Sequence, residues 1–139
     1  MSHFYTTEEV ESMIPLLKHY SSHIEDLFMT LELTCNEIDA LESSSSNSKK
    51  IDPKKTLNYL ECKFNLTEER ILDIVKEVQE LGMSICSPVF GVIDIPIISR
   101  KKVEAILCYE HNMSSAEDFL CHKIIKGKRR SELVRFLDL

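Results

Sequence analysis

Two long stretches of the chain place apolar residues at alternating spacings of three and four, and this feature limits the fold most. The first stretch is apolar at nine of its ten positions, which are Val10, Met13, Leu17, Tyr20, Ile24, Leu27, Leu31, Thr34, Ile38 and Leu41. The second is apolar at seven of its eight positions, which are Leu57, Leu60, Phe64, Thr67, Ile71, Ile74, Val78 and Leu81. Because an α-helix turns once every ~3.6 residues, this spacing lines one face of a helix. The sequence therefore predicts two long amphipathic helices.

Local signals set the bounds of the first helix. Thr6 precedes Glu9 by three residues, which is the pattern of a capping box, so the first helix is expected over residues 7–43. The stretch SSSSNSKK follows, with nothing apolar to bury and with side chains that compete for backbone hydrogen bonds. It predicts a flexible loop over residues 44–52.

The second helix is expected over residues 53–82. Asp52 supplies an N-cap, Pro53 stands at the first helical position, and Gly82 supplies a left-handed stop. Two such helices joined by a short loop form an antiparallel hairpin. Further apolar residues widen the helix faces beyond one seam, namely Ile14, Phe28, Leu72 and Val75. Either a sheet or a second copy of the chain must cover them.

After Gly82 the pattern changes to short runs rich in β-branched residues, which are MSICS, GVIDIPII, KVEAILCY and EDFLCHKII. Turn compositions separate them, so residues 83–126 are expected to form an antiparallel sheet of three to four strands. Pro96 within its run indicates an edge strand or a bulge. The end of the chain, residues 127–139, reads as a basic tail with a short helix starting near Ser131.

The fold class is therefore α+β, with residues 1–139 as a single domain. Residues 1–82 carry a net charge of −8 and residues 83–139 a net charge of +2. The acidic body disfavours nucleic acid as a partner. No apolar run is long enough to span a membrane, and no segment resembles a signal peptide. Five cysteines without paired spacing favour free thiols in the cytoplasm.

The segment LCYEHNMSSAEDFLCH gathers the types of residue that bind metals. Cys121 and His122 are neighbours on a predicted strand, so their side chains point to opposite faces. Cys108 and His111 have C-x-x-H spacing, but a structural zinc site needs a second pair of ligands. Cys108 and His122 share a face if they are opposed across the predicted hairpin. They are then either a ligand-binding pair or a buried thiol and a hydrogen-bonded sheet residue.

Asp94 lies among apolar neighbours in VIDIP, and a buried carboxylate requires a donor. Arg100, Arg129 and Arg130 are the candidate partners in an ion pair, although the same carboxylate suits a metal. Lys128 joins Arg129 and Arg130 at the turn that Gly127 permits, so these three cations are candidates for binding an anion. A solvated basic tail is the alternative.

The chain resembles a prokaryotic family, domain of unknown function 2203. The resemblance rests on Tyr5-Thr6-Thr7-Glu8-Glu9-Val10 with the later Met13-Ile14-Pro15, on Gly91-Val92-Ile93-Asp94-Ile95-Pro96, and on Leu107-Cys108-Tyr109. His122 and Gly127-Lys128-Arg129-Arg130 stand near a histidine and a terminal glycine-arginine of the family. Tyr109 stands where the family has a tryptophan, and Leu120-Cys121 stand where it has two aromatic residues. The resemblance implies a bacterial cytoplasmic protein and no particular activity.

Two main functions remain open from the sequence, beside a third possibility, the binding of phosphate or RNA by the basic tail. The first is a non-enzymatic cytoplasmic interaction or adaptor protein, which forms a homodimer through its helices and binds no cofactor. The second is an enzyme that depends on a small ligand or a divalent metal. Its site would lie between the sheet and the helices, with Asp94, Cys108 and His122 as the contacts.

Overall fold

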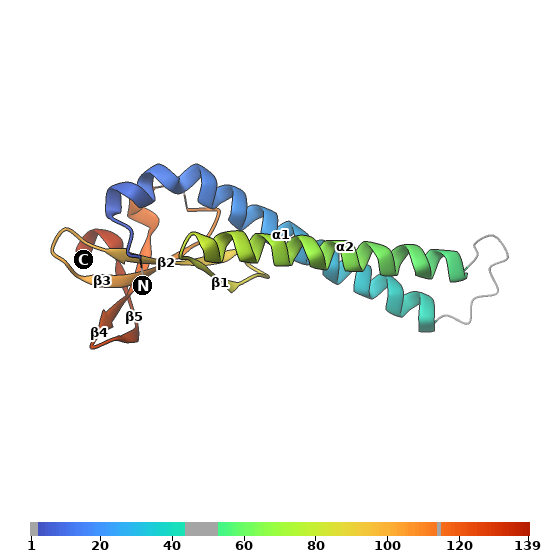
Figure 1. Ribbon diagram of the computed structural model, residues 1–139. Coiled ribbons are helices and arrows are strands. Elements are labelled where there is room, and N and C mark those ends of the chain that lie inside the picture. The colour runs from blue at the N-terminus through green and yellow to red at the C-terminus, as the bar shows by residue number, and fades with distance from the viewer. Residues whose placement is uncertain (1–2, 44–52, 114) are drawn as a thin grey trace.

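A hairpin of two long helices forms the first half of the molecule. The computed structural model describes residues 3–43, 53–113 and 115–139. Helix α1 (Thr7–Ser43) and helix α2 (Pro53–Glu80) lie side by side (Figure 1). Both predicted helices are confirmed, with α2 two residues shorter than expected. The loop predicted at residues 44–52 lies outside the described residues.

Capping contacts explain where α1 begins and why α2 ends. The backbone N–H of Glu9 donates to Thr6 Oγ1 at 3.2 Å, and the backbone N–H of Thr6 donates to Glu9 Oε1 at 3.0 Å. This reciprocal pair is the predicted capping box. After α2, Gly82 has a φ of +82°, a left-handed conformation that most residues avoid and that turns the chain toward the sheet.

The seam between the helices contains the predicted stripes, and every stripe residue is buried or half-buried. Two threonines interrupt the otherwise apolar seam. The Thr34 hydroxyl donates to the Thr30 carbonyl oxygen at 2.7 Å, and the Thr67 hydroxyl donates to the Lys63 carbonyl oxygen at 2.8 Å. Because each hydroxyl bonds to its own helix one turn back, a polar residue is buried here without an unmade hydrogen bond.

Five antiparallel strands follow, and their order across the sheet is the same as their order in the sequence. They are β1 (Ser84–Ser87), β2 (Val92–Ile98), β3 (Glu104–Tyr109), β4 (Leu120–Ile125) and β5 (Lys128–Arg135). The N-terminal segment also joins β2, where the Tyr5 N–H donates to the Pro96 carbonyl oxygen and the Ile98 N–H donates to the Tyr5 carbonyl oxygen, both at 2.9 Å. β2 is therefore an interior strand. Its proline lies where pairing with β1 gives way to pairing with Tyr5.

The sequence-based prediction of three to four strands is wrong, because the expected basic tail forms strand β5. Lys126 and Gly127 have φ values of 53° and 76°, and the pair Ile125–Lys128 flanks them. Two left-handed residues between paired strands make the two-residue turn that suits the twist of a hairpin. The expected terminal helix is also wrong, since a single 3-10 turn (Phe136–Asp138) follows β5.

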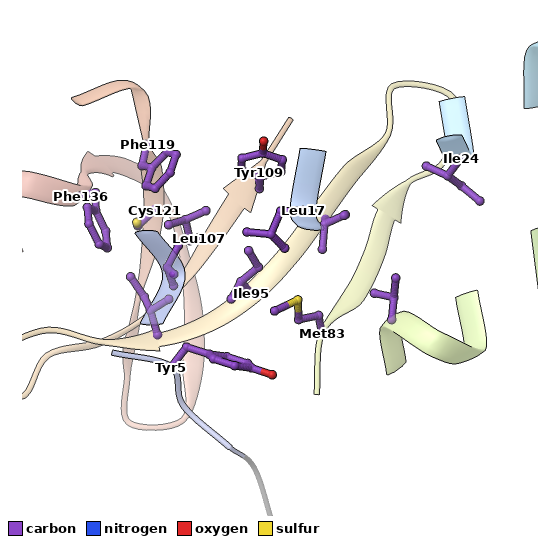
Figure 2. Close-up of a cluster of buried hydrophobic side chains, with 14 of the residues drawn as sticks. Tyr5, Leu17, Ile24, Met83, Ile95, Leu107, Tyr109, Phe119, Cys121 and Phe136 are labelled. Carbon is purple, nitrogen blue, oxygen red and sulfur yellow. The ribbon is translucent and has the colours of Figure 1, made fainter. Parts of the chain in front are cut away.

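The core lies between the two helices and the inner face of the sheet (Figure 2). Alternate residues of β2 and β3 supply this face, and all are fully buried: Ile93, Ile95, Ile97, Ala105, Leu107 and Tyr109. Phe119 stacks edge-on against Tyr109 and Phe136, at ring separations of 6.1 and 5.5 Å. Side chains alternate along a strand, so the remaining residues of β2 and β3 point to an outer face that α1 does not cover.

Candidate functional site

The outer face of the sheet brings together Asp94, Cys108 and Arg129. Asp94 and Cys108 are directly paired across β2 and β3. Arg129 Nη1 donates to Asp94 Oδ2 at 2.9 Å, and its Nη2 donates to Cys108 Sγ at 3.3 Å. Of the three arginines considered as partners of Asp94, Arg129 is the one that binds it. The cluster lies on the face opposite α1, whereas the sequence placed the site between the sheet and the helices.

This contact requires the sheet to curl. Arg129 belongs to β5, and Asp94 belongs to β2, three strands away. In a flat sheet with ~4.8 Å between neighbouring strands, the gap would be about 14 Å, farther than an arginine side chain reaches. The register of β4 and β5 shifts between His122 and Ile124, and such a bulge bends a strand. The β4–β5 ribbon leaves the plane of the other strands in Figure 1.

The curled ribbon and the outer face border an open hollow of about 430 Å³. Apolar groups make up most of the wall, with Met83, Pro96, Ile106 and Ile124 among them. The charged groups are Asp94, whose side chain is 13% exposed, and Arg129, at 41%. Binding sites for small molecules are usually apolar hollows with a few placed polar groups. The hollow could therefore hold a small, mostly apolar molecule with one polar group.

The thiol of Cys108 is unsuited to nucleophilic attack. Its pKa is raised to about 12, chiefly by burial and next by the negative charge of Asp94, whose effect outweighs the lowering by the nearby Arg129. The thiolate is the nucleophilic form, and a thiol with this pKa stays protonated at neutral pH. The second oxygen of the carboxylate, Asp94 Oδ1, is buried and has no hydrogen-bond partner among the described residues. The cluster is thus an ion pair that contacts a neutral thiol.

His122 lies on the same face as Cys108 but is not part of the cluster. In the pairing of β3 with β4, Cys108 lies opposite Leu120, whereas His122 lies opposite Ile106, two residues away from Cys108 along β3. His122 Nδ1 is 2.6 Å from the carbonyl oxygen of Arg130, so a local contact within the ribbon holds the ring. The structure therefore brings Asp94 and Cys108 together with Arg129 instead of with His122.

The three basic residues that were candidates for binding an anion do not share one face. Lys128 pairs with Ile125 and Arg129 with Ile124, so Lys128 points away from the side where Arg129 meets Asp94, whereas Arg130 lies in the stretch where the register of β4 and β5 shifts. Lys128 and Arg130 are both exposed. Within residues 3–43, 53–113 and 115–139, no three His, Cys, Asp or Glu side chains are grouped so that they could hold a metal ion.

A second polar cluster joins α1 to the β1–β2 turn, and the sequence did not predict it. His111 Nδ1 lies 3.3 Å from Ser21 Oγ and 3.4 Å from Glu25 Oε2. A catalytic triad uses the two different nitrogens of a histidine for the serine and the acid, whereas both contacts here use one nitrogen. Ser21 is fully buried and donates its hydroxyl to the Gly91 carbonyl oxygen at 2.6 Å. The cluster therefore fastens the turn to the helix.

That turn and α1 border a groove of about 610 Å³, called here the α1 groove. Its lining residues are Glu25, Phe28, Met29, Leu31, Glu32 and Cys35 of α1, with Val89 and Phe90 of the turn. Phe90 is 66% exposed, Val89 56% and Met29 54%. The sequence feature that could have predicted this groove is the pair Val89 and Phe90 between Pro88 and Gly91, because turns usually carry polar residues.

No helix in the part of the chain that the structure describes is long and apolar enough to cross a membrane.

In comparisons with known proteins, no curated protein and no solved structure matches the chain. A family does match, over residues 3–119. The matched region includes both helices, Asp94 and Cys108, and it ends before His122 and Arg129. The chain belongs to the family described as an uncharacterized conserved protein, domain of unknown function 2203 (DUF2203).

Proposed function

We propose that the protein is a non-enzymatic interaction protein of the bacterial cytoplasm that forms a homodimer through its helices. The observation that carries this proposal is the α1 groove, where three large apolar side chains, Met29, Val89 and Phe90, are each more than half exposed. Single exposed apolar residues are ordinary, but a contiguous apolar patch marks an interaction surface. The odd number of cysteines without paired spacing supports the cytoplasm.

The groove is held in shape before any partner binds. The hydrogen bond from Ser21 to the Gly91 carbonyl oxygen fixes the turn against α1, and the Gly91 N–H donates to the Pro88 carbonyl oxygen at 3.2 Å within the turn. The wall formed by Val89 and Phe90 therefore needs little ordering when a partner arrives. Preorganisation of this kind lowers the entropic cost of binding.

The helices carry more apolar surface than their seam covers. Large apolar side chains outside the seam are exposed by more than half, and they are Leu33, Tyr59, Leu66 and Leu72. In a hairpin of two helices, each helix covers only one side of the other. A second copy of the chain brings equivalent surface, so a symmetric dimer can cover the exposed apolar surface of both copies. These features support self-association over a partner that covers the groove alone.

The test is the mass of the purified protein in solution, measured by light scattering across a micromolar concentration series. We expect a dimer for the wild type and a monomer for Phe90→Ser, because the substitution removes the largest exposed side chain of the groove. Leu137→Ser is the matched control, since Leu137 is 62% exposed but lies in the C-terminal 3-10 turn. A wild type that stays monomeric throughout the series would overturn the proposal.

The hollow on the outer face of the sheet favours a second candidate, a protein that binds a small ligand. The feature in its support is the Asp94–Arg129 pair at the wall of an otherwise apolar hollow. The test is a thermal-shift screen with small aromatic acids and amines. Ile106→Phe, which fills the hollow, should abolish a genuine shift, whereas Phe90→Ser should leave it unchanged. A screen without any shift that Ile106→Phe removes would reject this candidate.

A further inference from the structure

We infer that the α1 groove receives the β4–β5 ribbon (Leu120–Ile125 with Lys128–Arg135) of a second copy of the chain. This inference rests on the proposed self-association, and it names the surface of the second copy that fills the groove. In a symmetric dimer each copy then gives one ribbon and receives one, so the two contacts are equivalent.

The charges of the chain are segregated between these two surfaces. Helix α1 carries nine acidic residues and one basic residue, a net charge of −8. Residues 120–135 carry six basic residues and one acidic residue, a net charge of +5. The whole chain has a net charge of only −6, so the opposite signs are concentrated on two separate elements. Surfaces of opposite sign attract each other, speed association and select a binding orientation.

The acidic residues follow the groove along its helix. Glu25, Glu32 and Asp39 are spaced by seven residues, about two helical turns, so they form nearly one row along α1. Glu25 and Glu32 line the groove, and Asp39 extends the row beyond it. Glu32 and Asp39 are exposed. A partner that lies in the groove must therefore be apolar along its contact and basic at its edge.

The ribbon has both properties. Ile125, which is 44% exposed, pairs with Lys128, so an apolar side chain and a cation share the face turned away from the Arg129–Asp94 contact, while Leu133, 50% exposed, pairs with His122 on the other face. Lys126, Lys128 and Arg130 are exposed, and within the described residues no carboxylate forms a salt bridge with any of them. The ribbon is also narrow, because a two-residue turn joins its strands.

The ribbon cannot fill the groove of its own chain. β5 is the last strand of the sheet, and the β1–β2 turn, which forms one wall of the groove, lies at the opposite edge. The contact of Arg129 with Asp94 also holds the ribbon over the outer face, whereas α1 packs on the inner face. The ribbon and the hairpin extend away from each other in Figure 1. An occupied groove therefore requires a second copy.

A nucleic acid is the other class of partner that a basic ribbon suggests. Surfaces that bind single strands combine cations with aromatic side chains that stack on bases. The segment 120–135 has no Phe, Tyr or Trp, the ring of its one histidine, His122, contacts the Arg130 carbonyl oxygen, and its exposed large apolar side chains are aliphatic. An aliphatic basic ribbon is better matched to an apolar acidic groove than to stacked bases.

A charge-swap experiment on the full chain tests the inference. One variant, Lys126→Glu with Lys128→Glu, makes the ribbon acidic, and the other, Glu32→Lys with Asp39→Lys, makes the groove row basic. All four residues are exposed, so circular dichroism should show both variants folded. In a homodimer of either variant, both contacts bring like charges together, so the affinity of dimerisation should fall by about tenfold or more. Mixed in equal amounts they should form a heterodimer within about threefold of wild-type affinity, because both contacts regain opposite charges.

The outcomes separate this inference from the proposed function. Two variants that dimerise like the wild type, while Phe90→Ser does not, would overturn the ribbon contact and leave self-association through the groove intact. Weakened variants that fail to pair with each other would also overturn it. A monomeric wild type would overturn both proposals. If the acidic-ribbon variant instead loses binding of a fluorescent single-stranded 20-mer and still dimerises, the ribbon is a nucleic-acid surface and the inference is wrong.

Discussion

The two halves of α1 differ in what covers them. In residues 7–27 the helix packs against both α2 and the sheet, and Val10, Leu17 and Ile24 are fully buried. In residues 28–43 the hairpin extends beyond the sheet (Figure 1), and stripe residues such as Ile38 are only half-buried. Near the sheet, the same periodic sequence thus produces a core shared by both helices and the sheet, and away from the sheet it produces a two-helix arm. We therefore expect stability to be concentrated in the near half, while the far half leaves apolar side chains such as Leu33 exposed.

The point where the sheet meets the near half should be the most sensitive to substitution. Gly91 has a φ of +65°, and a Cβ there would lie 2.3 Å from the backbone oxygen of Ser21. We expect Gly91→Ala to lower the free energy of unfolding by more than about 3 kcal/mol, because neither backbone can yield without separating the turn from the helix. Urea denaturation measures the loss.

Gly127→Ala is the matched control for this substitution. Gly127 also has a positive φ, of +76°, but a Cβ there has no neighbour within 4 Å. Only the backbone penalty of about 1 kcal/mol is expected. Equal losses in the two variants would show that the approach of the turn to α1 does not hold the near half together.

Matched truncations sharpen the comparison between the halves. Ile24→Ala empties a fully buried position in the near half and should cost about 3 kcal/mol or more, since the surroundings cannot collapse into the cavity. Ile38→Ala removes the same atoms from a half-buried position in the far half and should cost about 1 kcal/mol. Urea denaturation at a fixed protein concentration compares them. A larger loss for Ile38→Ala would mean that the arm, and not the sheet, carries the stability.

Periodicity predicted the helices because burial along a helix depends on local spacing. The stripes that include Ile24 and Ile38 needed no knowledge of the partner element. β5 was missed because its residues are mostly exposed, so no alternation of apolar and polar types marks it. What marks it is the Lys126–Gly127 turn, and a turn can be recognised as a hairpin only when both flanking strands are known.

The candidate site was predictable in part for the same reason. Asp94 stood out as a carboxylate in an apolar run, and Arg129 was one of its three named partners. The choice among them depends on the curl of the ribbon, which no local pattern encodes. The pairing of His122 with Ile106, in place of Cys108, depends on register, and a shift of two residues leaves the face unchanged. The α1 groove needed the position of Phe90 against α1, which is wholly tertiary.

Thiol reactivity gives a finer measure of the two regions. Cys35 and Cys62 are exposed on the helices, whereas burial raises the pKa of both Cys108 and Cys121 to about 12. At pH 7.5, alkylation by iodoacetamide should therefore be at least about tenfold slower at Cys108 and Cys121 than at Cys35 and Cys62, because the thiolate is the reactive form. Peptide mass spectrometry over a time course reads each site. Cys108 reacting as fast as Cys35 would mean that the outer face of the sheet is open.

The smallest effect should come from an exposed ion pair that ties the start of α1 to the loop after β2. The hydrogen bonds from Arg100 to Glu8 Oε1, at 2.6 and 3.1 Å, are the chief cause that lowers the pKa of Glu8 to about 2. A carboxyl group with a lowered pKa stabilises the fold above its unfolded pKa of about 4.3, and this contribution is lost as the pH falls from there toward 2. Arg100→Ala should return the pKa of Glu8 toward its ordinary value in a carboxyl NMR titration, with little change in stability at pH 7, because exposed pairs contribute little. Lys101→Ala, which alters an adjacent exposed cation, should leave that titration unchanged. If Glu8 of the wild type titrates near pH 4, the start of α1 is not tied to the sheet by this pair.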